Sequence, residues 1–313
     1  MTVFEPLPPV TSPPLTSGHS LTSGHRFDGE RHWAAAIELG FTRREEPAGS
    51  MTRLTRARHQ GPLRVQRPFY PEPHGVEGEA GSCHVYLLHP PGGLVSGDAL
   101  SIGAEVGPGA RALITTPAAN KLYRADSHGV AWAQHTKLRV QAGGELEWLP
   151  QETIAFDGSR GVQSTELALE KEARCLGWEV LALGRPAGEL PFVSGHLEQR
   201  FSLTRDGRPL WHERQLLDPT HPRFSGRWGQ GGASVQATLW AVGLDDEAGA
   251  VAMLREALPA SPRWAVTLRQ GVLLLRYLGD ERNEAWALCQ AAWMRLRPLL
   301  LGREACVPRI WMT

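Results

Sequence analysis

The sequence predicts a mainly β, or all-β, protein: a large solenoid-like or multi-sheet β body with two α-helices near the carboxyl end. Most of the chain consists of short segments in which apolar and polar residues alternate, which is the periodicity of strands. Turns centred on Gly or Pro separate these segments, and helical periodicity is clear only after residue 245. Because regular strand-helix-strand crossovers are missing from this pattern, it disfavours a doubly wound α/β enzyme.

Three pairs of strands are predicted from alternation on either side of a turn. Residues 100–116 alternate around Gly107-Pro108-Gly109, and residues 137–149 alternate around Gly143-Gly144. A third pair surrounds Asp206-Gly207, a favoured two-residue turn. In each case we expect the two strands to be neighbours in one sheet.

Apolar residues spaced at i, i+3 and i+7 predict two helices late in the chain. Asp245 can cap the first helix, and Pro259 closes it. Asp280 can cap the second helix, which has Pro298 as its stop. The segment between the helices, residues 264–275, alternates again and is predicted as strand.

The amino-terminal residues differ in composition from the rest of the chain. Residues 1–30 are rich in Pro, Ser, Thr and Gly, and a short Leu-Thr-Ser-Gly-His unit is repeated, ending at His19 and His25. We expect a disordered tail, because such a composition buries too little apolar surface to order itself. Imidazoles can bind nickel or zinc, but a flexible repeat does not fix ligand geometry. Residues 31–313 are expected to form a single domain.

The composition limits the partners of the protein. Its 33 basic and 33 acidic residues balance, so no global charge attracts nucleic acid or an anionic membrane. No apolar run approaches the roughly 20 residues that span a bilayer, and the first residues lack the pattern of a secretory signal. We therefore expect a cytoplasmic protein. Its four cysteines are far apart, which disfavours a disulfide scaffold and a structural zinc site.

Motifs of several common enzyme classes are missing. The Gly-rich stretch at residues 89–98 suggests a phosphate-binding loop, but it lacks the Gly-Lys-Ser/Thr ending that supplies a cation and a magnesium ligand. Neither a G-x-S-x-G nucleophile elbow nor an H-E-x-x-H zinc motif occurs. The motifs therefore give no support for an enzyme.

Several acidic residues occupy positions that are unusual for surface charges. Glu179 lies in an otherwise apolar segment, residues 177–184, while Asp98 follows a glycine and Asp157 ends a short apolar stretch. One interpretation is that the aspartates hold turns and that Glu179 points outward from a strand. The other is a water-filled passage, whose oxygen ligands bind a divalent ion weakly enough to release it.

Six segments of the chain carry distinctive motifs in a fixed order. They are residues 61–71 (GPLRVQRPFYP), 83–98 (CHVYLLHPPGGLVSGD), 115–124 (TTPAANKLYR), 146–152 (LEWLPQE), 183–189 (LGRPAGE) and 308–311 (PRIW). Together they resemble the motifs of the UreD family of urease accessory proteins, called UreH in some bacteria. The resemblance covers about residues 31–313.

This resemblance implies a fold, a function and partners. The fold would be all-β and solenoid-like with helices near the carboxyl end, in agreement with the periodicity. The function would be that of a chaperone in urease maturation: family members bind UreF, which recruits the GTPase UreG, and the assembly docks on apo-urease for GTP-dependent nickel insertion. GTP would be bound by the partner only. This chain would hold no stable cofactor, with nickel only in transit.

The resemblance also implies site residues. Family positions that match Asp98, Asn120 and Glu179 are thought to line an internal passage for nickel ions, so these three residues would be its metal ligands. The family usually has Gly-Gly-Asp where this chain has Ser-Gly-Asp at residues 96–98. Residues 120–124, Asn-Lys-Leu-Tyr-Arg, also differ slightly from the usual family motif.

Two other functions stay open from the sequence. The first is a β-solenoid carbohydrate-active enzyme, in which Glu147, Glu152 and Asp157 act as acid and base on one sheet face. An exposed groove lined with aromatic residues would favour it, whereas a buried passage would favour nickel transit. The second is a purely structural scaffold whose acidic residues never contact metal.

Overall fold

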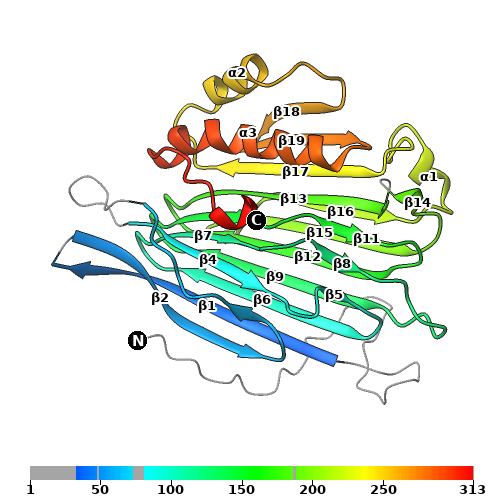
Figure 1. The fold of residues 1–313 in the computed structure, drawn as a ribbon. Coiled ribbons are helices and arrows are strands. Elements are labelled where there is room, and N and C mark those ends of the chain that lie inside the picture. Colours follow the sequence, from blue (N-terminus) through cyan, green and yellow to red (C-terminus); the bar gives the residue numbers. More distant parts are fainter. Residues whose placement is uncertain (1–32, 48, 73–80, 186–187, 313) are drawn as a thin grey trace.

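The predicted β-rich architecture is confirmed by the computed structural model, which describes residues 33–47, 49–72, 81–185 and 188–312 (Figure 1). Two large sheets form the body, and the longer helices near the carboxyl end pack on one of them. The predicted tail, residues 1–30, lies outside the described residues.

The described part of the chain contains the following elements. The strands are β1 (Trp33–Glu46), β2 (Gly49–Gln60), β3 (Arg64–Val65), β4 (Cys83–Leu88), β5 (Gly93–Leu94), β6 (Asp98–Val106), β7 (Arg111–Thr115), β8 (Asn120–Leu122), β9 (Trp132–Val140), β10 (Glu145–Leu149), β11 (Thr153–Ala155), β12 (Arg160–Leu169), β13 (Arg174–Arg185), β14 (Leu190–Pro191), β15 (His196–Arg205), β16 (Arg208–Leu217), β17 (Val235–Val242), β18 (Trp264–Arg269) and β19 (Val272–Gly279). The helices are α1 (Pro222–Ser225), α2 (Glu247–Ala257), α3 (Arg282–Leu301) and the 3-10 helix η2 (Arg309–Met312).

The central part of the chain coils between the two sheets. The seven-stranded sheet has the order β16-β15-β12-β9-β6-β1-β2, and the main path of the twelve-stranded sheet is β18-β19-β17-β13-β10-β7-β4-β3. Strands β6, β9 and β12 are parallel neighbours in the first sheet, while β7, β10 and β13 are parallel neighbours in the second. Parallel neighbours need a long connection, and here each connection runs through the facing sheet. This arrangement matches the predicted solenoid-like body.

Two of the three predicted strand pairs are wrong, because their turns are corners rather than hairpins. The turn at residues 107–109 leads from β6 in one sheet to β7 in the other, and residues 143–144 lead from β9 to β10 in the same way. Successive corners stack closely: a Cβ added at Gly144 would lie 3.0 Å from the carbonyl oxygen of Gly107. The third prediction is confirmed, since Asp206-Gly207 joins the antiparallel strands β15 and β16.

The first predicted helix, α2, is confirmed with its cap shifted by one residue. Asp246, not Asp245, is the N-cap, and its carboxylate accepts a hydrogen bond from the backbone N–H of Gly249 at 2.8 Å. Asp245 instead pairs with Arg174 at 3.2 Å. The cap is therefore set by which carboxylate is free to turn toward the helix.

The second predicted helix, α3, is confirmed, but both of its ends differ from the prediction. Its N-cap is Glu281 rather than Asp280. The helix continues through Pro298 to Leu301, where Gly302 ends it in the left-handed conformation. Because Leu301 is buried, its packing offsets part of the penalty of a proline inside the last turn.

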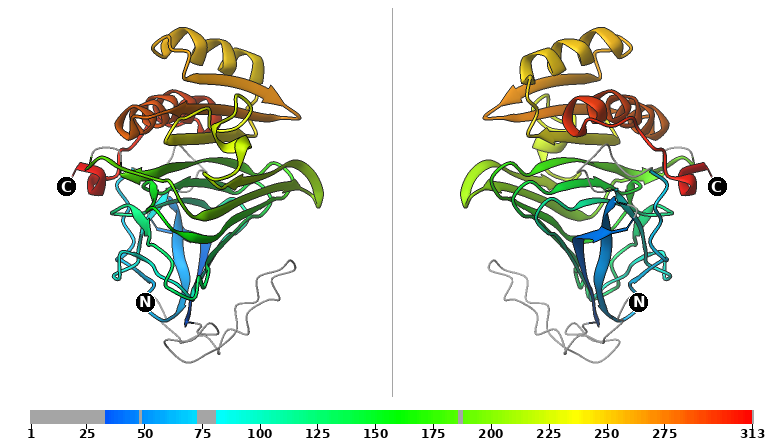
Figure 2. Two further views of the ribbon diagram at one scale, coloured as in Figure 1. Left: turned by 90° about the vertical axis from the view of Figure 1, so that its right-hand side faces the viewer. Right: turned by 90° about the vertical axis from the view of Figure 1, so that its left-hand side faces the viewer.

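Strand β13 is covered on both faces, which sets the surroundings of Glu179. Cys175 and Leu181 belong to the core between the two sheets, whereas Trp178 and Val180 belong to the core beneath the helices. Figure 2 shows these layers from the side. Alternation therefore directs Glu179 into the space between the sheets, because this strand has no solvent face.

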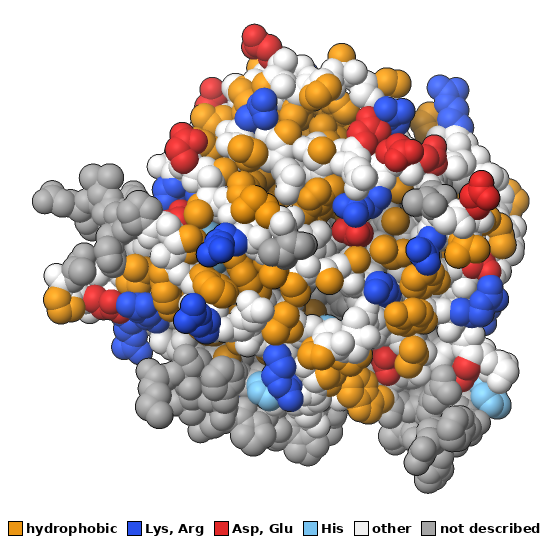
Figure 3. Space-filling model, viewed as in Figure 1, with side chains coloured by type: hydrophobic (Ala, Val, Ile, Leu, Met, Phe, Trp, Pro, Cys, Tyr) orange, Lys and Arg blue, Asp and Glu red, His pale blue; other side chains and the backbone are white. Residues whose placement is uncertain are grey.

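The surface is mixed in character. Figure 3 shows charged side chains of both signs interspersed with hydrophobic ones, in keeping with the balanced composition. Of the helices in the described ranges, none has the length and hydrophobicity that crossing a membrane requires.

Candidate functional site

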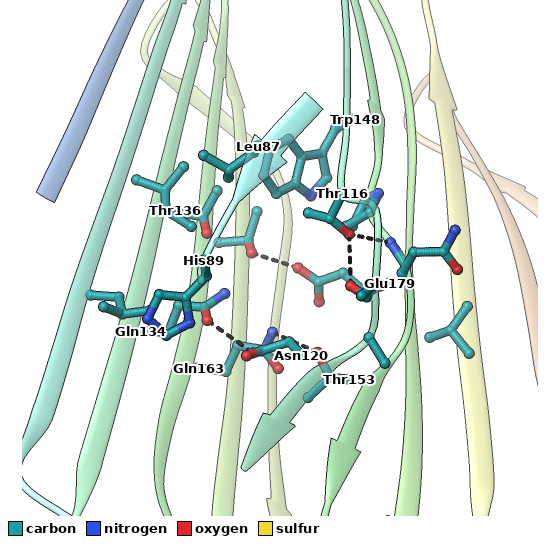
Figure 4. A pocket seen from close by; sticks show the side chains of 18 of the residues that line it. Leu87, His89, Thr116, Asn120, Gln134, Thr136, Trp148, Thr153, Gln163 and Glu179 are labelled. Atoms are coloured by element: carbon teal, nitrogen blue, oxygen red, sulfur yellow. Dashed lines mark hydrogen bonds between the residues drawn. The ribbon is translucent and has the colours of Figure 1, made fainter. Parts of the chain in front are cut away.

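A cavity of about 110 Å³ lies between the two sheets (Figure 4). A volume of this size has room for several water molecules. Its wall combines apolar residues with polar side chains that project from both sheets and from β8. The polar wall residues include Asn120, Gln134, Gln163, Thr165 and Glu179.

Glu179 reaches into this cavity from the middle of β13. Its Oε1 accepts a hydrogen bond from the Thr165 hydroxyl at 2.5 Å. Burial raises the pKa of Glu179 to about 7, while the Thr165 hydrogen bond lowers it and the nearby Glu213 charge raises it. The side chain remains partly accessible because it borders the void. Glu179 is therefore withdrawn from the surface and still able to meet water.

Asn120 lines the same cavity from β8, which belongs to the same sheet as β13. Its Nδ2 donates a hydrogen bond to Gln134 Oε1 at 3.0 Å. The backbone is fixed by β8, in which Asn120 pairs with Thr153 of β11 and donates its N–H to the carbonyl of Glu152 at 2.9 Å. The structure thus places Asn120 and Glu179 on the wall of one cavity.

Asp98, the third expected ligand, is not among the residues that line the cavity. Its carboxylate accepts a hydrogen bond from the backbone N–H of Val95 at 2.8 Å, and its own N–H donates to the Val95 carbonyl at 3.1 Å. These bonds close the turn between β5 and β6. Two residues that precede this turn, His89 and Gly92, do line the cavity.

A ladder of glutamines crosses the seven-stranded sheet beside the cavity. Paired positions on β9, β12, β15 and β16 are occupied by Gln134, Gln163, Gln199 and Gln215. Gln236 of the facing sheet donates hydrogen bonds to Gln199 at 2.5 Å and to Gln215 at 2.8 Å. Sequence analysis missed these residues. Their common inward position in alternating strands is the signal that could have identified them.

Two further cavities adjoin the first one. A cavity of about 40 Å³ shares Glu179 and Gln199 with it, and an open cavity of about 720 Å³ shares Gln215, Gln236 and Thr238 with the second. Through these shared wall residues the three cavities form a row that ends at a groove near α1 and β18.

The three acids of the carbohydrate-enzyme alternative do not form a pair on one sheet face. Glu147 faces α3 and is paired with Arg297 at 2.9 Å, while Glu152 is paired with Arg282 at 3.3 Å. Asp157 accepts hydrogen bonds from the backbone of the segment that leads into β15. In the described ranges, no group of three or more His, Cys, Asp or Glu side chains is arranged to hold a metal ion.

The fold and the cavity define a class of protein: a coiled β body that encloses a polar, carboxyl-bearing interior. The family model described as UreD urease accessory protein matches residues 34–312, and the chain belongs to that family. The resemblance seen in the sequence is thereby confirmed. Members of this family are non-catalytic accessory proteins of urease maturation, so the carbohydrate-enzyme alternative is rejected.

Proteins described as urease accessory protein UreD are similar to this chain over nearly their whole length. The urease accessory protein UreD of Chromohalobacter salexigens is 68% identical over 293 residues, which cover 93% of this chain and 92% of that protein. The UreD protein of Marinobacter nauticus is 69% identical over 292 residues, which cover 93% of this chain and 96% of that protein. The UreD protein of Pseudoalteromonas translucida is 60% identical over 304 residues, which cover 97% of this chain and 99% of that protein.

Proposed function

We propose that this chain assists nickel insertion into apo-urease as a partner of UreF and the GTPase UreG in the cytoplasm. Membership of the urease accessory family supports the maturation role. GTP would belong to UreG, and nickel would be a cargo of this chain rather than a resident cofactor.

We further propose that the three adjoining cavities form the nickel passage. The observation that carries this proposal is Glu179, a carboxyl group placed on the wall shared by two cavities. A divalent ion exchanges between oxygen ligands only where water also reaches them, and Glu179 meets that condition. A carboxylate in a dry site would neutralise and bind an ion poorly.

Asn120 and Asp98 take different parts in this proposal. Asn120 supplies a polar wall group that is held in place by Gln134. Asp98 supports the passage indirectly, because its hydrogen bond with Val95 closes the turn after the loop that carries His89.

The test removes charge without changing shape. The double variant Asp98→Asn, Glu179→Gln retains a hydrogen-bond acceptor at both positions but loses both carboxylates. We expect urease activation at scarce nickel to fall by about tenfold or more, as it does when the groups around a metal ion are altered. Binding to UreF and apo-urease should be unchanged in a pull-down, because Glu179 lies inside the protein.

The matched control is Glu166→Gln, which removes a carboxylate from an exposed position beside Thr165 on β12. This variant should activate urease like the parent. If the double variant also activates urease fully when nickel is scarce, the passage proposal fails, and the purely structural scaffold becomes the better account.

A further inference from the structure

The Gly-rich stretch at residues 89–98, which lacks the features of a phosphate-binding loop, borders the cavity between the sheets. It joins β4 to β5 and starts at His89, whose carbonyl accepts a hydrogen bond from the Gly92 N–H at 2.8 Å. A Cβ added at Gly93 would lie 2.4 Å from the carbonyl oxygen of Lys121, so the loop can pack this closely on β8 only with glycine there. The packing fixes His89 next to the strand that begins at Asn120.

The imidazole of His89 lacks the partners that a buried ring normally has. Neither ring nitrogen has a hydrogen-bond partner among the described residues, and both nitrogens are out of contact with solvent. A buried polar group without a partner is destabilising, and native proteins contain few of them. Both ring nitrogens of His89 are therefore available to a ligand.

His89 lines the cavity together with Asn120 and Gln134 (Figure 4). Burial lowers the pKa of His89, so the ring is neutral and keeps a free lone pair at neutral pH. Torsion about the Cβ–Cγ bond of a histidine is soft, and a rotation can turn one nitrogen toward the void. The side-chain amides of Asn120 and Gln134 already bond to each other at 3.0 Å and can supply oxygen ligands.

We propose that His89, with the amide oxygens of Asn120 and Gln134, forms a transient binding site for a divalent transition-metal ion, nickel in the proposed function. This inference rests on the nickel passage and assigns the selectivity of that passage to one residue. Oxygen ligands such as Glu179 suit magnesium and calcium as well as nickel, whereas an imidazole strongly favours nickel over both. His89 would therefore let the passage accept nickel in the presence of abundant magnesium.

The test measures nickel binding to the purified full-length chain without its partners. His19, His25 and His32 are first replaced by alanine, so that the amino-terminal imidazoles do not bind the probe. This triple-alanine protein is the parent, and it is compared with the same protein carrying His89→Ala. His128→Ala is the control, because His128 is exposed and lies outside the cavity. Affinities for Ni²⁺ and Mg²⁺ are measured by calorimetry, and nickel X-ray absorption reports imidazole ligation.

We expect His89→Ala to weaken Ni²⁺ binding by about tenfold or more and to remove the imidazole signal, with Mg²⁺ binding unchanged. The control should bind both ions like the parent. The melting temperature of His89→Ala without metal should fall only slightly, by the packing of a half-buried ring, because the ring makes no hydrogen bond that could be lost. His89→Gln, which keeps a polar side chain, provides a second variant if alanine impairs folding.

The outcomes separate this inference from the passage itself. If Glu179→Gln lowers nickel delivery but His89→Ala leaves Ni²⁺ affinity and the imidazole signal intact, the His89 site is refuted and the passage stands. If neither substitution alters nickel binding or delivery, both proposals fail together. Equal weakening of Ni²⁺ and Mg²⁺ binding in His89→Ala would also refute the selectivity role.

Discussion

An Arg297→Ala variant is expected to lose about 3–5 kcal/mol of its free energy of unfolding. Arg297 is fully buried on α3, where its Nε donates to Glu147 Oε1 at 2.9 Å and its Nη2 donates to Glu72 Oε1 at 2.6 Å. Alanine would leave both carboxylates buried without their cation. Removing one partner of such a group is strongly destabilising, because the remaining charge stays desolvated. Urea denaturation at pH 7 measures the loss.

The neighbours of Arg297 hold the carboxylates in place. Trp293 donates a hydrogen bond to Glu147 at 2.7 Å, and His84 lies 2.6 Å from Glu72. Burial would raise the pKa of Glu72, but the His84 hydrogen bond and the Arg297 charge outweigh it and lower the pKa to about 2. Glu72 is therefore ionised at neutral pH, and the Arg297→Ala variant would bury an uncompensated charge.

The control for this prediction is Arg295→Ala, an exposed position on the same helix. It should change stability by no more than about 0.5 kcal/mol. A combined variant, Arg297→Met with Glu72→Gln and Glu147→Gln, should recover part of the lost stability, since no unpaired charge remains. Equal stabilities for Arg297→Ala and Arg295→Ala would show that the buried ion pairs contribute nothing to the fold.

Glu179→Gln is expected to stabilise the nickel-free protein by about 3 kcal/mol at pH 9 and by less than about 1 kcal/mol at pH 5. The pKa of Glu179 is about 7 in the folded protein, compared with a usual value of 4.5. The fold therefore favours the protonated form, which predominates below pH 7. Between about pH 4.5 and 7 the unfolded chain has lost this proton while the folded protein retains it, so the native state is progressively destabilised relative to the unfolded one. Above pH 7 both states are ionised, and the penalty stays constant. Glutamine has no proton to lose.

Denaturation curves at pH 5, 7 and 9 in the presence of a metal chelator test this dependence. The exposed control, Glu166→Gln, should show the same small difference from the parent at every pH. A stability difference for Glu179→Gln that does not grow with pH would mean that the carboxyl group is already ionised inside the cavity at low pH.

The sequence predicted the β class and the late helices for identifiable reasons, whereas it left open whether Glu179 points outward or into the protein. A charged residue in an apolar strand must face some interior when both sides of the strand are covered, and Glu179 does. The Asp206-Gly207 turn was predictable because this dipeptide favours a hairpin whatever surrounds it. The core of α3 was predictable from its spacing, since Trp293 and Leu296 are both buried.

The rest depended on contacts between distant segments. Glycine turns at residues 107–109 and 143–144 reverse the chain, but local sequence does not determine whether the returning strand pairs or crosses to a facing sheet. Glu147 alternates with apolar residues as a surface residue would, and only its buried partner Arg297 reveals its role. His89 was not selected because nothing in the sequence indicates that its ring lacks a hydrogen-bond partner.

The coiled path of the chain also determines how it must fold. Each parallel pair joins segments that are separated by a full circuit of both sheets, as β6 is from β9 and β9 is from β12. Such pairs form slowly, because the entropy of closing a long loop opposes the first contact. Until they form, unpaired strand edges can pair with other chains and aggregate. A partner that binds only the folded protein would shift the equilibrium away from the aggregation-prone unfolded chain and raise the yield of soluble protein.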